Sequence, residues 1–481
     1  MSEILDVVVV GAGLSGIAAG YHLQAESPTR TYAILESRDT IGGTWDLFRY
    51  PGIRSDSDMH TLGFSFRPWK GAKAIADGPS ILEYIKDTAR DLGIDRKIRF
   101  GHRVERASWS SETSTWTVEV TKTATGELVV LTCRFLLMCS GYYDYAAGYT
   151  PEFPGTERFR GRLVHPQKWT SDIAYEGKRV VVIGSGATAV TLVPELAKKA
   201  ARVTMLQRSP TYVISRPAVD AVAKWMERKL PGGLAYDLTR WKNVAAGLAF
   251  FQFSRRFPER AKKLLIGQVR KSLGPGVDVA KHFTPSYFPW DQRLCLVPDG
   301  DLFDAVTSGR AEIVTDHIET FTETGLALRS GKVLEADLIV TATGLALQLL
   351  GDVKLTVDGQ PIDLGKTTNY RGTMLSGVPN LALAFGYTNA SWTLKADLVC
   401  EFVCRLLNHM ERTGKKKCIA QTEPGLPQEP LLDFSSGYVQ RAVAQMPKQG
   451  LKAPWRLYQN YLLDLLGFRY GAVEDGVLEL T

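Results

Sequence analysis

The pattern of apolar and polar positions predicts the same pair of elements at two places in the chain. Residues 7–10 and 179–183 are runs rich in β-branched residues, as expected for parallel strands buried on both faces. Each run leads directly into a glycine-rich loop, and residues 17–24 after the first loop have helical spacing. A second strand follows each unit, within TYAILE and within ARVTML. The pattern therefore predicts an α/β fold with two Rossmann-like dinucleotide-binding units.

The first loop has the spacing G-x-G-x-x-G, formed by Gly11, Gly13 and Gly16. Such glycines allow a tight turn, a close approach of the backbone to a pyrophosphate, and close packing of helix on strand. Glu36 ends the next strand, 25 residues after Gly11, where a carboxylate can accept hydrogen bonds from ribose hydroxyls. Together with Ser15, these residues predict a dinucleotide site in which the phosphates face the helix N-terminus.

The second loop has the related spacing G-x-G-x-x-A, and the cofactor-binding residues that it predicts are Gly184, Ser185, Gly186, Ala187, Thr188 and Ala189. Its following strand ends in Gln207 and Arg208 rather than in an acid, and Arg208 lies 24 residues after Gly184. A guanidinium at this place suits a 2′-phosphate, which a carboxylate would repel. We therefore expect NADPH at the second loop. At the first we expect FAD, whose ADP half has the same shape demands.

The cysteines limit where electrons from such a flavin can go. Six cysteines are scattered along the chain without CxxC or mixed Cys/His spacing, at Cys133, Cys139, Cys295, Cys400, Cys404 and Cys418. Neither a zinc site, nor any other metal site, nor a redox dithiol is predicted, and most of these thiols should be small buried groups. A quinone, a protein acceptor or oxygen remains as the electron acceptor.

Length and composition fit a globular enzyme of two or three domains. The chain has 481 residues, of which 44% are hydrophobic and 23% charged, and no apolar run approaches the roughly 20 residues that span a bilayer. The N-terminus enters a strand pattern almost at once and leaves no room for a signal peptide, so we expect a cytoplasmic protein. No feature indicates nucleic-acid binding.

The formal charge of +7 is concentrated in one segment. Residues 221–273 hold twelve Lys or Arg against three Asp or Glu, mixed with apolar residues at roughly helical spacing. This segment predicts a helical insertion over residues 217–282. Its apolar side is expected to pack on its own domain, and the alternative is a face for peripheral membrane contact or for an anionic partner.

Two signatures resemble those of type I Baeyer-Villiger monooxygenases. One is F-x-G-x-x-x-H-x-x-x-W just ahead of the second loop, formed by Phe159, Gly161, His165 and Trp169. The other matches at Gly42, Gly43, Trp45, Tyr50, Pro51, Gly52 and Asp56. The resemblance extends along essentially the whole chain, and it is closest to the ethionamide-activating branch of the family.

The resemblance implies a discontinuous FAD domain interrupted by an NADPH domain. We place the FAD domain at residues 1–150 and 335–481 and the NADPH domain at 151–334, with a hinge crossing at Thr343-Gly344. His165 would be a linker residue that couples NADPH binding to domain movement, with Trp169 packed beside it. On the sequence alone, a lone histidine in a linker is more often a structural residue than a catalyst.

The resemblance also implies which residues carry the chemistry. Arg293 matches the family's active-site arginine, a cation that stabilises a peroxyflavin anion, and Asp56 matches its carboxylate partner. Thr44 and Trp45 would flank the isoalloxazine, Val104 would contact the adenine through its backbone, and Arg54 is assigned to the cofactor site. The implied reaction converts ketones to esters or lactones with NADPH and O₂, with sulfides or thioamides as further substrates.

Two alternatives remain open at this point. One is a flavin-containing monooxygenase that oxygenates nitrogen or sulfur, and the other is a flavoprotein reductase that serves a protein partner through the basic segment. Neither the substrate's identity and size nor the oligomeric state follows from the sequence.

Overall fold

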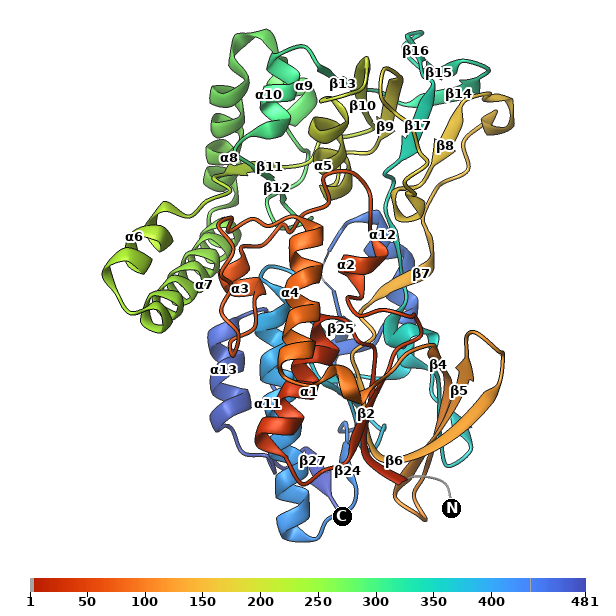
Figure 1. Cartoon of the computed structure of the whole chain (residues 1–481), viewed down its shortest axis with the longest axis vertical. Helices are drawn as coiled ribbons and strands as arrows, with labels where there is room; N and C mark the ends of the chain where they lie inside the picture. The colour runs from red at the N-terminus through yellow and green to blue at the C-terminus, as the bar shows by residue number, and fades with distance from the viewer. Residues whose placement is uncertain (1–3, 433) are drawn as a thin grey trace.

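The computed structural model describes residues 4–432 and 434–481. Two large sheets form two halves of the molecule, one below the other in Figure 1. The lower sheet has the strand order β20-β19-β4-β5-β6-β1-β2-β3, and β23 also pairs with β6. The bounds of these strands are β1 (Ile4–Val10), β2 (Tyr32–Leu35), β3 (Ile98–Arg99), β4 (His102–Ser110), β5 (Thr115–Lys122), β6 (Leu128–Met138), β19 (Lys354–Val357), β20 (Gln360–Pro361) and β23 (Leu381–Leu383).

The strands of the lower sheet present apolar residues on both faces, and each face is therefore covered. Helices cover one of the two faces. The helices α1 (Leu14–Glu26), α4 (Gly78–Asp91) and α11 (Trp392–Thr413) share one apolar core with β1 and β6. The opposite face carries a second core, in which Trp109 and Trp116 pack 5.6 Å apart between ring centroids. The helix α13 (Tyr461–Tyr470) lies against α11 on the outside.

The upper sheet is parallel and has the order β13-β10-β9-β17-β8. Its strands are β8 (Arg162–Val164), β9 (Arg179–Ile183), β10 (Arg202–Gln207), β13 (Ala311–Thr315) and β17 (Leu338–Thr341). The helices α5 (Ala187–Leu196), α8 (Pro258–Leu273) and α10 (Asp301–Thr307) share a core with one face. A small sheet of β14 (Ile318–Thr322), β15 (Gly325–Leu328) and β16 (Val333–Glu335) packs on the other. The predicted α/β class with two Rossmann-like folds is confirmed.

The predicted domain boundary at residue 335 is wrong by the length of one strand. β17 pairs with β8 and β9, so the chain stays with the upper sheet up to Thr341. The sequence placed this buried strand in the lower unit because its run of apolar residues suits either sheet. The wider division into an FAD domain and an NADPH domain stays a prediction.

Two antiparallel strands join the halves. In β7 (Tyr143–Gly148) the chain passes from the lower half to the upper half, and in β18 (Leu345–Leu347) it passes back to the lower half. At their upper end the Thr343 hydroxyl donates to the Tyr149 carbonyl at 2.7 Å, and the Tyr149 amide donates to the Gly344 carbonyl at 3.1 Å. The crossing therefore lies where the hinge was predicted.

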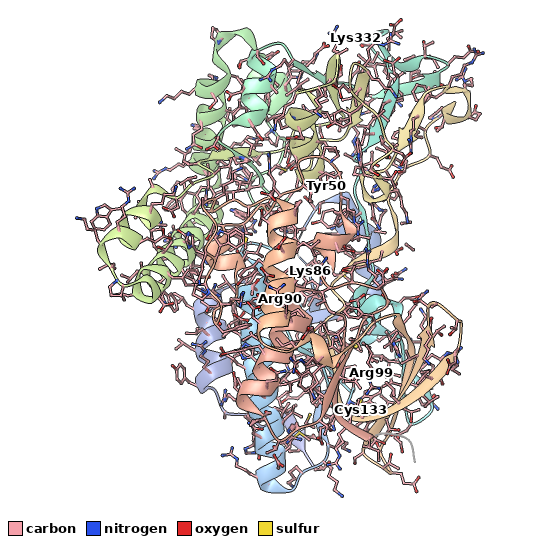
Figure 2. All side chains as sticks on the ribbon, in the orientation of Figure 1. Tyr50, Lys86, Arg90, Arg99, Cys133 and Lys332 are labelled. Atoms are coloured by element: carbon pink, nitrogen blue, oxygen red, sulfur yellow. The ribbon has the colours of Figure 1, made fainter. Side chains whose placement is uncertain are left out.

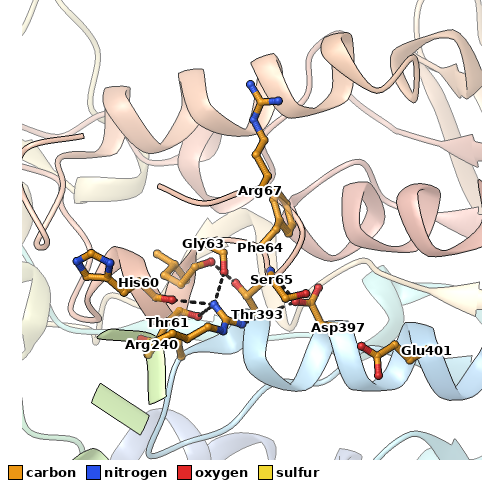
Figure 3. Close-up of polar contacts among 12 residues, drawn as sticks. His60, Thr61, Gly63, Phe64, Ser65, Arg67, Arg240, Thr393, Asp397 and Glu401 are labelled. Carbon is orange, nitrogen blue, oxygen red and sulfur yellow. Dashed lines mark hydrogen bonds and ion pairs between the residues drawn. The ribbon is translucent and has the colours of Figure 1, made fainter. Parts of the chain in front are cut away.

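The predicted insertion is helical and consists of α6 (Ala221–Lys229), α7 (Gly232–Arg256), α8 and α9 (Val279–Phe283). The α8 helix packs on the upper sheet's core, as expected. The α7 helix does not: buried Arg240 donates to the carbonyls of His60 at 2.7 Å and Gly63 at 2.8 Å, in the lower half (Figure 3). The expectation that the insertion packs on its own domain is therefore only partly correct, because α7 spans both halves.

The remaining elements are short. They are α2 (Thr44–Leu47), α3 (Met59–Leu62), α12 (Gly437–Ala442), β11 (Val213–Arg216), β12 (Cys295–Pro298), β21 (Asn369–Tyr370), β22 (Met374–Leu375), β24 (Cys418–Ala420), β25 (Gln428–Pro430), β26 (Lys448–Gly450) and β27 (Leu478–Leu480). All six cysteines are buried and free, as predicted. Across the described residues, no helix has both the length and the apolarity that crossing a membrane requires.

Candidate active site between the two halves

A cavity of about 630 Å³ lies at the carboxyl ends of β1, β2 and β6, where ligands bind in open α/β sheets. Gly11, Gly13 and Glu36 line it from the lower sheet, and Ala187 and Thr188 line it from the start of α5. The two predicted glycine loops therefore meet at one cavity. Figure 2 shows Tyr50, another lining residue, between the two halves.

The first glycine loop leaves no room for side chains on its protein side. Gly11 has φ +102°, and a Cβ there would lie 2.7 Å from the Cys139 carbonyl oxygen. A Cβ on Gly16 would lie 1.9 Å from the Gly11 carbonyl oxygen. By contrast, a Cβ on Gly13 would meet only the Gly43 backbone at 3.4 Å, so this glycine keeps the cavity side of the loop open.

The side chains of Glu36 and Ser15 are held in place by partners within the chain. Glu36 is only 6% exposed; its Oε2 accepts from the Ala12 amide at 2.7 Å, and its Oε1 accepts from the Arg38 amide at 2.9 Å. The Ser15 hydroxyl accepts from Nε1 of Trp392 at 2.8 Å. Because two backbone amides fix the carboxylate at the rim of the cavity, Glu36 is placed to receive the hydroxyls of a ribose.

The segment 42–56 runs from the first loop to the upper half. Thr44, Trp45 and Arg54 line the cavity, as does Val104 from β4. Arg54 forms a bidentate ion pair with Asp301 at the start of α10. Gly52 has φ +76°, and its missing side chain lets the segment approach α5, where a Cβ would lie 3.0 Å from Cβ of Glu195.

Asp56 and Arg293 meet at the upper wall of this cavity. Nε of Arg293 lies 3.0 Å from Oδ2 of Asp56, and about a third of each side chain is exposed. Both residues line the cavity. The charge of Asp56 raises the pKa of the Arg293 guanidinium above its usual value, so Arg293 stays a cation at every physiological pH.

Three tyrosines surround this ion pair, and the sequence analysis missed them. The hydroxyls of Tyr142 and Tyr143 lie 3.0 Å apart, and both residues line the cavity. Burial raises the pKa of Tyr143 and of Tyr438 to about 12 and that of Tyr142 well above its usual value, while the positive charge of Arg293 opposes each rise. Tyr142 and Tyr143 directly follow Cys139-Ser140-Gly141, the turn after β6, and this position was the available signal.

The second glycine loop repeats the geometry of the first. Gly184 has φ +136°, and a Cβ there would lie 2.2 Å from the Ala342 carbonyl oxygen, just as Gly11 faces Cys139. Gly186 faces open space, and Ala189 is fully buried in α5. The Ser185 hydroxyl donates to the Ser209 carbonyl at 3.0 Å. The loop is thus built like a phosphate-binding turn whose open side is Gly186.

The two residues predicted to select NADPH differ in their surroundings. Gln207 is 2% exposed, and its side-chain amide donates to the His282 carbonyl at 2.7 Å and to the Thr315 hydroxyl at 2.8 Å. These contacts give Gln207 a structural role. Arg208 is exposed on the turn after β10, next to Ser209. Within the described chain, no ion pair of Arg208 is found.

The linker signature packs onto the crossing strands. Nε2 of His165 lies 3.0 Å from the Gly344 carbonyl oxygen, and a Cβ on Gly148 would lie 1.9 Å from the His165 ring. Burial lowers the pKa of His165 below its usual value, which favours the neutral ring. Gly161 allows close approach to the Asp337 carbonyl, where a Cβ would lie at 2.7 Å.

The two aromatic members of the signature lie in apolar cores. Phe159 packs against Phe321, with 6.2 Å between ring centroids. Trp169 is buried in the upper core and contacts Tyr175, with 6.1 Å between ring centroids. Of the four signature residues, His165 is therefore the one whose side chain contacts the two strands that join the halves.

A smaller cavity of about 150 Å³ adjoins the large one and shares Asp56 with it. Its lining comes from both halves and is mixed. Polar residues such as Asp58, Arg216 and Asn243 stand beside the apolar residues Ile75, Ile214, Val244, Leu248, Phe250, Leu294, Leu296 and Leu394. Nε1 of Trp290 and Oδ1 of Asn389 are buried in its wall, and neither has a hydrogen-bond partner among the described residues. This cavity suits a molecule that combines an apolar part with polar groups.

Comparisons with known proteins agree with this geometry. A family model described as flavin-binding monooxygenase-like matches residues 73–225, and one described as an NAD(P)-binding Rossmann-like domain matches residues 9–77. The chain is 55% identical to the FAD-containing monooxygenase EthA of Mycobacterium tuberculosis over 478 residues, which cover 99% of this chain and 97% of the relative. It is 47% identical to the probable FAD-binding monooxygenase AlmA of Acinetobacter baylyi over 483 residues, 99% of this chain and 96% of the relative.

Solved structures share the fold at lower sequence identity. A steroid monooxygenase bound to NADP superposes with a TM-score of 0.78 at 21% identity, covering 99% of both chains. A cyclohexanone monooxygenase from Rhodococcus bound to NADP⁺ gives a TM-score of 0.75 at 21% identity over 100% of both chains. With its curated relatives matched over nearly their full length, the chain belongs to the family of FAD-containing monooxygenases.

Proposed function

We propose that this protein is an FAD- and NADPH-dependent monooxygenase that inserts one atom of O₂ beside the carbonyl of a ketone, giving an ester or lactone. Oxygenation of sulfides or thioamides is the proposed second activity. The observation that carries this proposal is the ion pair of Arg293 and Asp56, which faces the cavity shared by the two glycine loops. The names of its relatives, FAD-containing monooxygenases, support it.

The large cavity fits FAD. Gly11 and Gly13 would let its pyrophosphate approach the start of α1, the fixed carboxylate of Glu36 would hold the ribose, and Thr44 and Trp45 would flank the ring system. When bound, FAD supplies the activation of O₂ with electrons from NADPH. Val104 and Arg54 complete the proposed set of FAD contacts from the cavity wall.

The second loop is the proposed NADPH site. Gly186 leaves its open side free for the pyrophosphate, while Ala187 and Thr188 at the start of α5 reach the large cavity. Arg208 is exposed on the neighbouring turn, where it would pair with the 2′-phosphate. A nicotinamide held by this loop would therefore face the same cavity as the flavin.

Arg293 is proposed as the group that stabilises negative charge during the reaction with the carbonyl. Its pKa is raised, so it never loses its proton, and Asp56 holds the guanidinium toward the cavity. Tyr142, Tyr143 and Trp392 line the cavity nearby and are partly buried, so their rings would limit the access of water and strengthen the field of this cation.

His165 is proposed as a linker residue that transmits the state of the second loop to the crossing strands. Its neutral ring contacts Gly344, which directly precedes β18, and Gly148 at the end of β7. It does not line the large cavity, so a direct role in the chemistry is not part of the proposal. A cytoplasmic location stays a prediction.

The test is to supply the purified holoenzyme with NADPH and ¹⁸O₂, together with a cyclic ketone or a sulfide. We expect one ¹⁸O atom in the lactone formed from the ketone. Sulfoxide without lactone, over ketones of graded size, would favour the nitrogen- and sulfur-oxygenating alternative. NADPH consumption with reduction of an added protein acceptor, and no labelled product, would favour a reductase.

A further inference from the structure

One side of the molecule exposes an unusual amount of apolar surface. The residues are Val222 and Trp225 on α6, Leu234, Leu238 and Trp241 on α7, and Tyr458, Leu462, Leu463, Leu466 and Tyr470 on or next to α13. These three helices lie along the same edge of the molecule, at the left of Figure 1. We call this set the apolar edge. Trp225 is 59% exposed, and Tyr470 is 75% exposed.

The apolar edge is continuous across two elements that are far apart in the sequence. On α7, Leu234, Leu238 and Trp241 follow one another at helical spacing, while Ala235, Tyr236 and Arg240 face inward. The Trp241 ring contacts the Tyr461 ring at the start of α13, with 5.9 Å between centroids. On α13, Phe468 packs inward on Phe402, which turns Leu463 and Leu466 outward. Monomeric soluble proteins rarely leave such a surface uncovered.

Cations border this surface. Lys224, Arg228 and Lys229 lie on α6, and Lys452 and Arg456 precede α13; none of the five forms an ion pair with another described residue. Only Glu227 and Asp237 are exposed acids on α6 and α7. Leucine and tryptophan beside unpaired lysine and arginine is the composition of a helix that lies in the interface of an anionic bilayer, with apolar side chains among the acyl chains and cations at the phosphates.

The smaller cavity reaches this edge from within. Asn243, Val244 and Gly247 line it from α7, and Gln459 and Tyr461 line it from the start of α13. Tyr461 is also the ring that Trp241 contacts. The cavity therefore extends from Asp56, beside Arg293, to the seam where the two apolar helices meet.

We propose that the apolar edge docks the protein on the surface of an anionic phospholipid bilayer, and that apolar substrates dissolved in the bilayer enter the smaller cavity between α7 and α13. The second part rests on the proposed function, whereas docking does not. A long, sparingly soluble ketone or sulfide is the substrate class that this route favours, because it partitions into the bilayer before it reaches the protein.

The docking test uses full-length, FAD-loaded protein in flotation with phosphatidylcholine vesicles or with vesicles of three parts phosphatidylcholine to one part phosphatidylglycerol. We expect at least about tenfold stronger binding to the anionic vesicles, weakened by added NaCl. The double variant Leu463→Glu/Leu466→Glu should bind at least about 100-fold more weakly, since each buried leucine contributes about tenfold or more. The variant Arg228→Gln/Lys229→Gln should lose the preference for anionic vesicles.

The matched control is Leu264→Glu on α8, because Leu264 is as exposed as Leu463, at 50%, but belongs to the upper half. It should float like the wild type, and FAD content and melting temperature should show that all variants are folded. Absence of flotation by the wild type, or equal flotation of the leucine variant, overturns the proposal. So does a dimer in light scattering that the leucine variant separates while neither form floats, because the edge would then bind a second copy.

The entry route is tested with a small soluble cyclic ketone and a long-chain ketone presented in the anionic vesicles. The leucine variant should keep the wild-type KM for the soluble ketone and raise the KM for the long-chain ketone about tenfold or more. Equal KM values for the long-chain ketone overturn the route. If neither ketone reacts while flotation is normal, the proposed function fails and docking stands.

Discussion

Oδ2 of Asp56 lies 3.0 Å from Nε of Arg293, across the junction between the lower and upper halves of the molecule. Asp56 ends the segment 42–56, which begins beside the first glycine loop. Arg293 lies just before β12 in the upper half. The pair therefore depends on how the two halves are assembled. It holds the fixed positive charge at the place where both proposed cofactor sites open into one cavity.

Asp56→Asn should lower the rate of product formation about tenfold to 100-fold while FAD stays bound. The amide keeps the shape of the carboxylate but not the charge that orients Arg293. Steady-state product formation and the FAD-to-protein absorbance ratio check this. A matched change of an exposed acid, Glu112→Gln, should leave both at wild-type values. Wild-type turnover in Asp56→Asn would contradict the role of the pair.

Gly186→Ala should raise the KM for NADPH at least about tenfold without loss of FAD or of stability. No protein atom lies within 4 Å of a Cβ at Gly186, so only a bound dinucleotide would meet the new methyl group. Gly267→Ala on α8 is the control, because it also meets nothing within 4 Å. Steady-state kinetics and thermal melting separate the two variants, and an unchanged KM in Gly186→Ala would place the NADPH pyrophosphate elsewhere.

Arg208→Ala should raise the KM for NADPH about tenfold to 100-fold and leave the KM for NADH unchanged. The reason is that the guanidinium would pair only with the 2′-phosphate, which NADH lacks. Arg202→Ala, at the start of the same strand and paired with Glu312, serves as control. Equal effects on both nucleotides in Arg208→Ala would show that Arg208 acts on the fold instead of on the phosphate.

Stability should decrease as the pH rises from about 6.5 to 9, because of His22. Burial lowers the pKa of His22, but the charge of Asp397 at 3.6 Å and the charged hydrogen-bond partner Glu26 at 2.7 Å outweigh burial and raise the pKa from 6.5 to about 9. The folded state therefore binds this proton more tightly than the unfolded state. Its contribution, up to about 3 kcal/mol, is complete below pH 6.5 and lost as pH rises through 9.

Thermal melting of the holoenzyme between pH 6 and pH 9.5 checks this dependence. His22→Gln should be less stable than the wild type at pH 6 and approach it at pH 9.5. His317→Gln, on an exposed turn, should keep the wild-type slope. Parallel curves for His22→Gln and the wild type would mean that the His22 charge does not hold α1 to α11.

Local features of the site could be predicted from the sequence, and long-range ones could not. The two glycine loops are local: Gly11 and Gly184 each need a positive φ and a missing side chain, and spacing reveals both. Glu36 follows from the same spacing. The partnership of Arg293 with Asp56 came from the resemblance, because no periodicity relates residues 237 positions apart.

The contacts of Arg240 show why the packing of the helical insertion against the lower half could not be predicted from the sequence. Its guanidinium donates to the carbonyls of His60 and Gly63 and lies 3.8 Å from Asp397, so it joins α7 to the lower half (Figure 3). In the sequence it is one of twelve cations in a basic segment. Its burial depends on where α7 crosses α3, and neither composition nor spacing contains that information.

The most direct test of the central claim is a comparison of wild type and Arg293→Ala in two measurements on the same preparation, anaerobic reduction of the flavin by NADPH and aerobic formation of lactone from a ketone. The control is Arg255→Ala on α7. It removes an exposed arginine that pairs with Asp291, in the loop that carries Arg293, and so tests whether loosening this loop is enough to change either measurement. The account predicts that Arg293→Ala keeps flavin reduction within about threefold of wild type and loses lactone formation by at least about 1000-fold. Lactone formation that persists without Arg293, or flavin reduction that disappears together with it, would contradict the account.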